Sequence, residues 1–213
     1  MELTEKIIDH KLRLISSIGQ AKSIRDFGGM WKVDGLYLVE GAKDLKCEEA
    51  EMIDKLKTEK YEESIKGSVT TFLYHDIDFR ELATSDLYPM EVSLLNDVVL
   101  HQDNFTEVLK QVSRLTTKYI VIQQPCYEGF NIPSSCSLLQ FMPMEWRKKL
   151  YNIMWVDQSD QEKFNVDIWM WAQSRQLLID ILKGYGWTVE EDKQYTFLIS
   201  DNWFYTGLVF KKS

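Results

Sequence analysis

Acidic and amide side chains follow several short apolar segments of this 213-residue sequence, where they could bind a polar ligand. They are Asp26, Asp54, Asp76, Asn96 and Asp97. Carboxylates accept hydrogen bonds from hydroxyl and amino groups, and they balance the charge of a cationic ligand. Asp26 is followed by Gly28-Gly29, and glycine permits the backbone angles that a closely approaching ligand requires. Each acid alone could instead cap a helix, so the prediction of a shared binding rim depends on the whole set.

His101 is the first choice for a general base, should the chemistry require a proton to be removed from a hydroxyl group. Imidazole exchanges protons near neutral pH, which suits that role. Asp97 is the second choice, either as the base or as the group that orients the reacting molecule. The alternative for His101 is a histidine at a helix start that is bonded to the backbone.

Residues 126–165 contain two prolines and many aromatic side chains, and they fit no regular element. They lie between the fifth predicted strand and the helix over 174–183, and their aromatic side chains could contact a bound substrate. Tyr127, Glu128 and Trp155 are the candidates for substrate contacts, because aromatic rings stack on ring-shaped ligands and a carboxylate accepts from hydroxyl groups. The alternative is a hydrophobic flap that completes the core.

Helices and strands alternate along the chain in positions that would gather these residues. Periodicity predicts helices over 2–20, 34–46, 55–65, 104–115 and 174–183, and strands over 23–27, 50–54, 69–74, 91–96 and 119–123. Asp34 is a possible N-cap of the second helix, and Pro125 is expected to end the fifth strand. Residues 187–212 are predicted to form two antiparallel strands joined near Asp201-Asn202.

This alternation predicts an α/β fold, with a mostly parallel seven-stranded sheet, helices on both faces and an antiparallel C-terminal hairpin. The length predicts one domain over 1–213, which begins with an N-terminal helical segment, 1–20. Ligands of an open parallel sheet bind at the carboxyl ends of its strands. The acids named above follow predicted strands, which favours a single site.

Composition and charge argue against several classes of protein. The net charge of −8 would repel a phosphate backbone, so no nucleic-acid partner is expected. No apolar run approaches the roughly 20 residues that cross a bilayer, so no membrane partner is expected either. Three cysteines without a C-x-x-C pair predict reduced thiols and a cytoplasmic location. No group of side chains has convincing metal-ligand spacing, so no metal is expected.

The order of these elements and acids resembles that of the class I, Rossmann-like S-adenosylmethionine-dependent methyltransferases, over roughly residues 20–212. The first strand of that family ends in D-x-G-x-G-x-G. Here the stretch is Asp26-Phe27-Gly28-Gly29-Met30-Trp31-Lys32, which keeps only the first motif glycine. Val98-Val99-Leu100-His101 resembles the family's VLHH segment. A nicotinamide-binding enzyme is the nearest competitor, but residues 28–33 lack its G-x-G-x-x-G turn.

The resemblance implies S-adenosylmethionine as the cofactor and S-adenosylhomocysteine as the product. It implies that Asp26, with Gly28 and Gly29, holds the cationic methionyl end. Asp54 would bond the ribose hydroxyls, with Glu51 as the alternative. Asp76 would accept from the adenine amino group, Ile77 would pack on the adenine ring, and Asn96 would lie beside the transferred methyl group.

The resemblance also implies methyl transfer, and it implies that residues 126–165, the main insertion relative to a minimal domain of the family, cover the acceptor. We expect the acceptor to be a hydroxyl of a small molecule, sugar or glycan. The aromatic insertion and the acidic charge favour a sugar. One alternative is N- or C-methylation of a metabolite. Another is a methyltransferase-like domain that binds without catalysis, which the altered glycine motif favours. The oligomeric state has no signature in the sequence.

Overall fold

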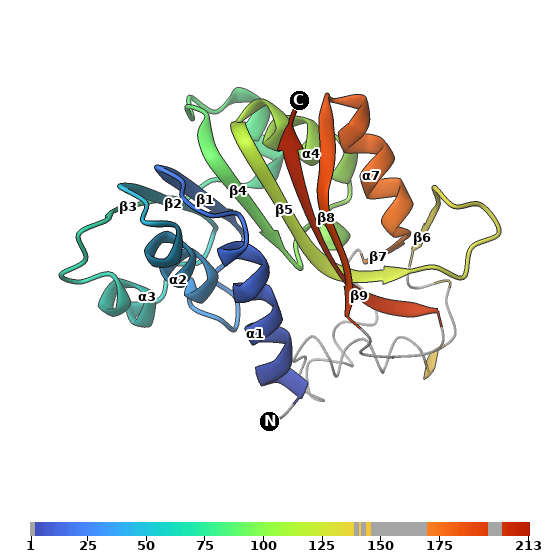
Figure 1. Ribbon diagram of the computed structural model, residues 1–213, viewed down its shortest axis with the longest axis horizontal. Helices are drawn as coiled ribbons and strands as arrows, with labels where there is room; N and C mark the ends of the chain where they lie inside the picture. Colours follow the sequence, from blue (N-terminus) through green and yellow to red (C-terminus); the bar gives the residue numbers. More distant parts are fainter. Residues whose placement is uncertain (1–2, 139–140, 142–143, 146–169, 196–201) are drawn as a thin grey trace.

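The structure is a computed structural model that describes residues 3–138, 141, 144–145, 170–195 and 202–213. A seven-stranded sheet runs through it in the order β3-β2-β1-β4-β5-β9-β8 (Figure 1). The first five strands are parallel, and β9 and β8 continue the sheet in antiparallel pairing. The predicted α/β architecture, with its C-terminal hairpin, is confirmed.

The elements have the following bounds. The parallel strands are β1 (Ser23–Phe27), β2 (Glu49–Ile53), β3 (Thr71–His75), β4 (Met90–Asn96) and β5 (Thr116–Tyr127), and the C-terminal pair is β8 (Trp187–Tyr195) and β9 (Trp203–Lys212). The α-helices are α1 (Leu3–Ser16), α2 (Leu36–Leu45), α3 (Glu59–Ser64), α4 (Phe105–Arg114) and α7 (Arg175–Gly184), and the 3-10 helices are η1 (Phe79–Thr84) and η2 (Val99–His101). Strands β6 (Cys136–Leu138) and β7 (Trp171–Gln173) form a separate two-stranded sheet.

Each face of the sheet has its own apolar core. Side chains of α1 and α2, such as Ile15 and Leu38, belong to one core, whereas Leu109 of α4 and Leu178 of α7 belong to the other. Burying a side chain of this size contributes roughly 1.5–3 kcal/mol, so these contacts hold the helices on the sheet. Within the described residues, no helix has the length and apolar character needed to cross a membrane.

Strand β5 is longer than predicted, and Pro125 lies inside it instead of ending it. Pro125 is opposite Tyr205 of β9. Its other neighbour, β4, has already ended, since the last pair between β4 and β5 is Asn96 with Gln123. A proline is tolerated at such a one-sided position because its missing N–H removes no bond to a second strand. The predicted insertion therefore begins as strand, and it also contains β6.

The start of α2 also differs from the prediction. The residue before the helix is Gly35, with φ +74°, and it provides no side-chain cap. Asp34 itself has φ +49°, and its carboxylate is bonded to Lys60 at 3.0 Å. Asp34 is therefore not the N-cap, and the chain reaches α2 through a left-handed turn.

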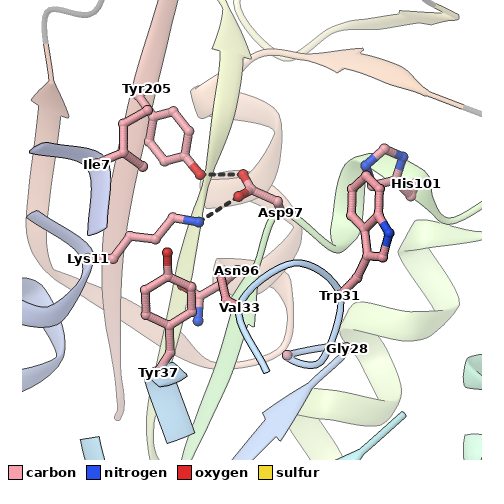
Figure 2. A pocket seen from close by; sticks show the side chains of 11 residues that line it. Ile7, Lys11, Gly28, Trp31, Val33, Tyr37, Asn96, Asp97, His101 and Tyr205 are labelled. Carbon is pink, nitrogen blue, oxygen red and sulfur yellow. Dashed lines mark hydrogen bonds and ion pairs between the residues drawn. The ribbon is translucent and has the colours of Figure 1, made fainter. Parts of the chain in front are cut away.

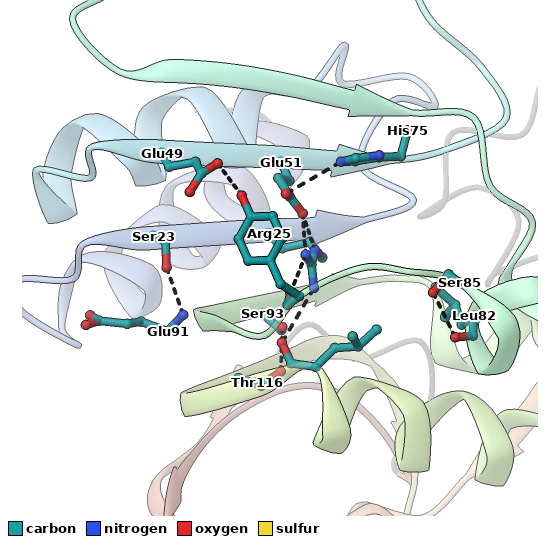
Figure 3. Close-up of polar contacts among 12 residues, drawn as sticks. Ser23, Arg25, Glu49, Glu51, His75, Leu82, Ser85, Glu91, Ser93 and Thr116 are labelled. Carbon is teal, nitrogen blue, oxygen red and sulfur yellow. Dashed lines mark hydrogen bonds and ion pairs between the residues drawn. The ribbon is translucent and has the colours of Figure 1, made fainter.

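A buried ion pair connects β1 with β2 (Figure 3). Nε of Arg25 donates to Glu51 at 2.6 Å, and both side chains are fully buried. The same guanidinium donates to the carbonyl oxygen of Tyr88 at 2.8 Å. Glu51, the alternative candidate for a ribose contact, is thus committed to the interior of the sheet, and that alternative is wrong.

Candidate functional site

The order of the strands reverses between β1 and β4, which are neighbours in the sheet but not in the sequence. Connections leave such a switch point toward opposite faces, so a crevice opens at the carboxyl ends of the two strands. Gly28 follows β1, and Asp97 follows β4. The predicted site residues closest to this point are therefore brought together by the topology.

The loop over residues 28–35 has an unusual backbone. Gly28, Lys32, Asp34 and Gly35 all have positive φ, between 49° and 76°. Non-glycine residues adopt this region at a cost, and such strain is often found at functional sites. Two hydrogen bonds close the loop, from Asp34 N to the carbonyl oxygen of Met30 and from Gly35 N to that of Gly29, each at 2.9 Å.

The first two glycines of this loop, Gly28 and Gly29, are required by their surroundings. A Cβ on Gly28 would lie 2.8 Å from a methyl carbon of Val98 and would also meet a positive φ of 76°. A Cβ on Gly29 would lie 2.1 Å from Oδ2 of Asp26. The loop therefore passes directly over the Asp26 carboxylate, which a larger residue would displace.

Asp26 is fully buried at the switch point. Its pKa is raised to about 7, mainly by burial and also by the nearby charge of Asp54, while the Lys11 cation lowers it. Neither carboxylate oxygen has a hydrogen-bond partner among the described residues. A buried carboxylate without a partner is costly, so this position favours a ligand or proton that neutralises it.

Asp54 connects the end of β2 to the glycine loop. Its Oδ2 accepts from Met30 N at 3.0 Å, and its Oδ1 accepts from Leu56 N at 2.9 Å. Its carbonyl oxygen accepts from the Tyr74 hydroxyl at 2.6 Å. Each carboxylate oxygen can accept a further bond, so Asp54 remains able to hold a pair of hydroxyl groups.

A cavity of about 60 Å³ lies at the switch point (Figure 2). It is lined by Ile7, Lys11, Gly28, Gly29, Trp31, Val33, Tyr37, Asn96, Asp97, His101 and Tyr205. We call it the first cavity. It collects residues from α1, the glycine loop, the end of β4, and β9. Five of the predicted cofactor or catalytic positions are in this lining: Gly28, Gly29, Asn96, Asp97 and His101.

Asp97 is held by two donors that enter the first cavity from distant parts of the chain. Nζ of Lys11 lies 2.5 Å from Oδ2, and the Tyr205 hydroxyl donates to Oδ1. Asn96 beside it accepts from Nε2 of Gln123 at 3.1 Å. Each oxygen of Asp97 thus already accepts a hydrogen bond. This arrangement favours the orienting role predicted for Asp97 over its role as a base.

A second cavity, of about 330 Å³, continues from the first. Gly28 and His101 line both. The remaining lining residues are Asp54, Lys55, Ile77, Asp78, Phe79, Arg80, Gln102 and Asp103. Asp78 caps η1 and is bonded to Arg80, which lowers its pKa to about 2. His101 therefore lies where the two cavities meet, and Asp54 and Ile77 border the larger one.

Other predicted positions are not part of the lining of either cavity. Asp76 is 68% exposed and ion-paired with Lys55, at 3.2 Å. Tyr127 packs against Phe130 and Trp203. Oε1 of Glu128 accepts from the backbone N of Arg175, at the start of α7. Tyr127 and Glu128 therefore support the fold here and do not line the cavities. Trp155 lies outside the described residues.

The structure adds residues that sequence reasoning missed. Lys11, Trp31, Tyr37 and Tyr205 all line the first cavity. The sequence pattern could have identified Lys11, because it places a charge on the apolar face of α1, four residues after Ile7. No local pattern could have identified Tyr205, since only the pairing of β9 with β5 brings it to the end of β4. The described residues include no group of three His, Cys, Asp or Glu arranged for a metal ion.

No protein-family model matches this sequence, and no curated protein matches it. Solved structures do. An O-methyltransferase family protein from Burkholderia thailandensis has a TM-score of 0.65 and 14% identity; the match covers 99% of this chain and 56% of that one. The chain thus spans little more than half of that relative's length.

Two further structures are similar. Coclaurine N-methyltransferase, bound to N-methylheliamine and S-adenosylhomocysteine, has a TM-score of 0.67 and 11% identity, covering 97% of this chain and 72% of that one. The N-terminal domain of EvdMO1, in the presence of S-adenosylhomocysteine and D-fucose, has a TM-score of 0.60 and 12% identity, covering 100% and 85%. These similarities and the switch-point site agree with the predicted resemblance. The chain has the fold of the class I S-adenosylmethionine-dependent methyltransferases.

Proposed function

We propose that this chain binds S-adenosylmethionine and transfers its methyl group to a hydroxyl of a small molecule, sugar or glycan. One observation carries the proposal: the acids and glycines that follow β1, β2 and β4 converge on two joined cavities at the switch point. The similar structures that contain S-adenosylhomocysteine support the choice of cofactor.

The residues of the site fit this cofactor. Asp26 is buried with both oxygens unpartnered among the described residues, so a cationic methionyl ammonium would satisfy it, directly or through water. Gly29 lets the backbone approach this carboxylate without a side chain in between, and Gly28 lines both cavities. Asp54 has accepting capacity left for the two ribose hydroxyls, and Ile77 borders the second cavity, where an adenine ring would pack. We leave Asp76 out of this set because its side chain pairs with Lys55.

The bound cofactor would supply an activated methyl group and a good leaving group, so the protein's work is to align the acceptor and exclude water. His101 lies where the cavities meet, and we assign it the removal of the acceptor's proton. Asn96, which also lines the first cavity, has a buried Nδ2 without a partner among the described residues, so it can donate to a ligand. Asp97 holds the side chains of Lys11 and Tyr205 in place in the wall of the first cavity.

Two of the similar structures guide the choice of acceptor. The EvdMO1 domain was crystallised in the presence of D-fucose, which supports a sugar hydroxyl. Coclaurine N-methyltransferase has the same fold, so N-methylation is the second candidate. We further propose that the protein acts in the cytoplasm, in line with its three free cysteines.

Calorimetric titration with S-adenosylhomocysteine tests the proposal. We expect micromolar binding by the parent protein, loss of binding in Asp54→Ala, and retained binding in Asp76→Ala, the matched control whose side chain lies outside both cavities. NAD should not bind. If the folded parent does not bind S-adenosylhomocysteine, the cofactor assignment is wrong. If Asp76→Ala loses binding as Asp54→Ala does, Asp76 has the adenine role that the sequence predicted.

Once binding is established, release of S-adenosylhomocysteine in the presence of candidate acceptors tests the reaction. We expect turnover with a hydroxyl acceptor and its loss in His101→Ala, with cofactor affinity unchanged. Turnover with amines alone would favour the second candidate. Binding without turnover across hydroxyl and amine acceptors would favour a non-catalytic domain.

A further inference from the structure

Lys11 occupies an unusual place for a charged residue. Its side chain is 1% exposed, and it lies on the face of α1 that packs on the sheet. Its ammonium is 4.9 Å from the centre of the Tyr37 ring and 5.2 Å from that of Tyr205. Burying a lysine is costly unless the charge is compensated, and here Asp97 compensates it at 2.5 Å. The fold therefore holds a buried cation, the Lys11 ammonium, in the wall of the first cavity.

Asp97, the ion-pair partner of Lys11, has an unusual backbone conformation. Asp97 has φ +57°, a region that aspartate tolerates better than most residues. Its two oxygens accept from Lys11 and from Tyr205 (Figure 2). While both donors stay, each oxygen of this carboxylate already has a partner within the protein. Releasing Lys11 would leave one oxygen of Asp97 facing the cavity.

The charges of the site match those of a methionyl group, which carries one ammonium and one carboxylate. Asp26 offers an anion to the ammonium. Lys11 is the only lysine or arginine among the described residues that line the first cavity, and it shares that lining with Gly28 and Gly29. Its charge also acts on Asp26, whose pKa it lowers against the larger effect of burial. Lys11 and Asp26 thus provide charges of opposite sign at the switch point, as the two ends of one amino-acid group require.

Resting on the proposed function, we propose that the Lys11 ammonium binds the methionyl carboxylate of the cofactor and thereby releases Asp97 to the acceptor. The step exchanges one ion pair for another, since Lys11 keeps a carboxylate partner and Asp97 keeps Tyr205. It makes α1 the element that couples cofactor binding to the acceptor site, and it requires the cofactor to bind first.

Calorimetric titration with two ligands tests this role. S-adenosylhomocysteine has the carboxylate, whereas 5′-methylthioadenosine keeps the adenosine and thioether but lacks it. In Lys11→Met we expect about 10- to 100-fold weaker binding of S-adenosylhomocysteine, the value of a charged hydrogen bond, and unchanged binding of 5′-methylthioadenosine. In Asp97→Asn we expect tighter binding of S-adenosylhomocysteine, because Lys11 no longer leaves an ion pair. Lys6→Met, on the exposed face of the same helix, is the matched control.

The outcomes separate this inference from the proposed function. Equal losses for both ligands in Lys11→Met, or weaker S-adenosylhomocysteine binding in Asp97→Asn, would overturn the exchange while leaving the cofactor assignment intact. If Lys11→Met does not fold, Lys11→Met/Asp97→Asn, which leaves no uncompensated carboxylate, takes its place with the same expectation. If the folded parent binds neither ligand, the proposed function fails first.

Discussion

Asp26 is a carboxylate that the fold buries before a ligand is present. Its pKa is raised to about 7, mainly by burial, so the folded state holds its proton more tightly than the unfolded chain does. Such a group favours folding most below its unfolded pKa, and that contribution is lost as the pH rises toward 7. The parent should therefore lose stability from Asp26 between about pH 4 and pH 7.

Asp26→Asn removes this titration, and urea unfolding at pH 5 and pH 8 measures the effect. We compare the free energy of unfolding of the variant with that of the parent at each pH. We expect this difference to favour the variant by about 2–3 kcal/mol more at pH 8 than at pH 5, because the parent loses roughly 1.4 kcal/mol per pH unit as Asp26 loses its proton. Asp86→Asn, an exposed carboxylate, is the control and should show no such difference. A pH-independent difference for Asp26→Asn would mean that the buried carboxylate does not titrate in this range.

Gly29 tests the close contact between the loop and Asp26. A Cβ there would meet Oδ2 of Asp26 at 2.1 Å, so we expect Gly29→Ala to lower the free energy of unfolding by about 1–3 kcal/mol. Gly184→Ala is the control, since a Cβ at Gly184 meets nothing within 4 Å. Adding Asp26→Ala to Gly29→Ala should recover much of the loss. Equal stability of the two single variants would show that the loop moves aside freely.

The residues that sequence reasoning identified share one property. Gly28 and Asp54 each follow a strand directly, and Asp26 is the penultimate residue of β1, so a correct strand assignment places all three at the carboxyl edge of the sheet. Lys11 and Tyr205 do not, because they are 86 and 108 residues from Asp97 and meet it only through the packing of α1 and the pairing of β9. A single sequence contains no local pattern for such contacts.

At the level of elements, short parallel strands were the most predictable. The strand over 23–27 is confirmed residue for residue as β1, because the Gly28-Gly29 turn marks its end. The 3-10 helix η1 was missed, although Asp78 and Glu81 form the capping box that marks its start. The length of β5 was missed because a proline normally ends a strand, and the one-sided position of Pro125 depends on where β4 stops.

The pairing of β1 with β2 depends on more than backbone bonds, because Arg25 and Glu51 are both fully buried. Arg25→Met would leave the Glu51 carboxylate uncompensated, so we expect a loss of about 3–5 kcal/mol in the free energy of unfolding. Arg25→Met/Glu51→Leu should recover most of it, since no charge then remains. Arg13→Met, which breaks a surface pair with Asp9, should change stability by less than about 0.5 kcal/mol. Chemical denaturation measures all three, and an unrecovered double variant would show that the pair itself stabilises the sheet.

Considered as a whole molecule, the fold places its candidate ligand contacts at one end of the sheet. They come from α1, from the segments after β1, β2 and β4, and from β9. The far edge, made of β8 and covered by α7, contributes none of the residues that line the two cavities. A ligand bound at the switch point would therefore connect segments that are distant in sequence but leave that edge unaffected.

Amide hydrogen exchange with and without S-adenosylhomocysteine tests this arrangement. We expect slower exchange in residues 28–35, 54–56 and 97–102, which form or adjoin the two cavities, and in the part of α1 around Lys11, because binding stabilises locally open segments. Residues 175–195 serve as the internal control and should exchange at the same rate in both samples. Protection confined to residues 175–195 would place the ligand at the opposite edge and contradict the switch-point site. Protection of the loops without α1 would support the cofactor site but contradict a role for Lys11, because a helix that binds the carboxylate must itself become more stable.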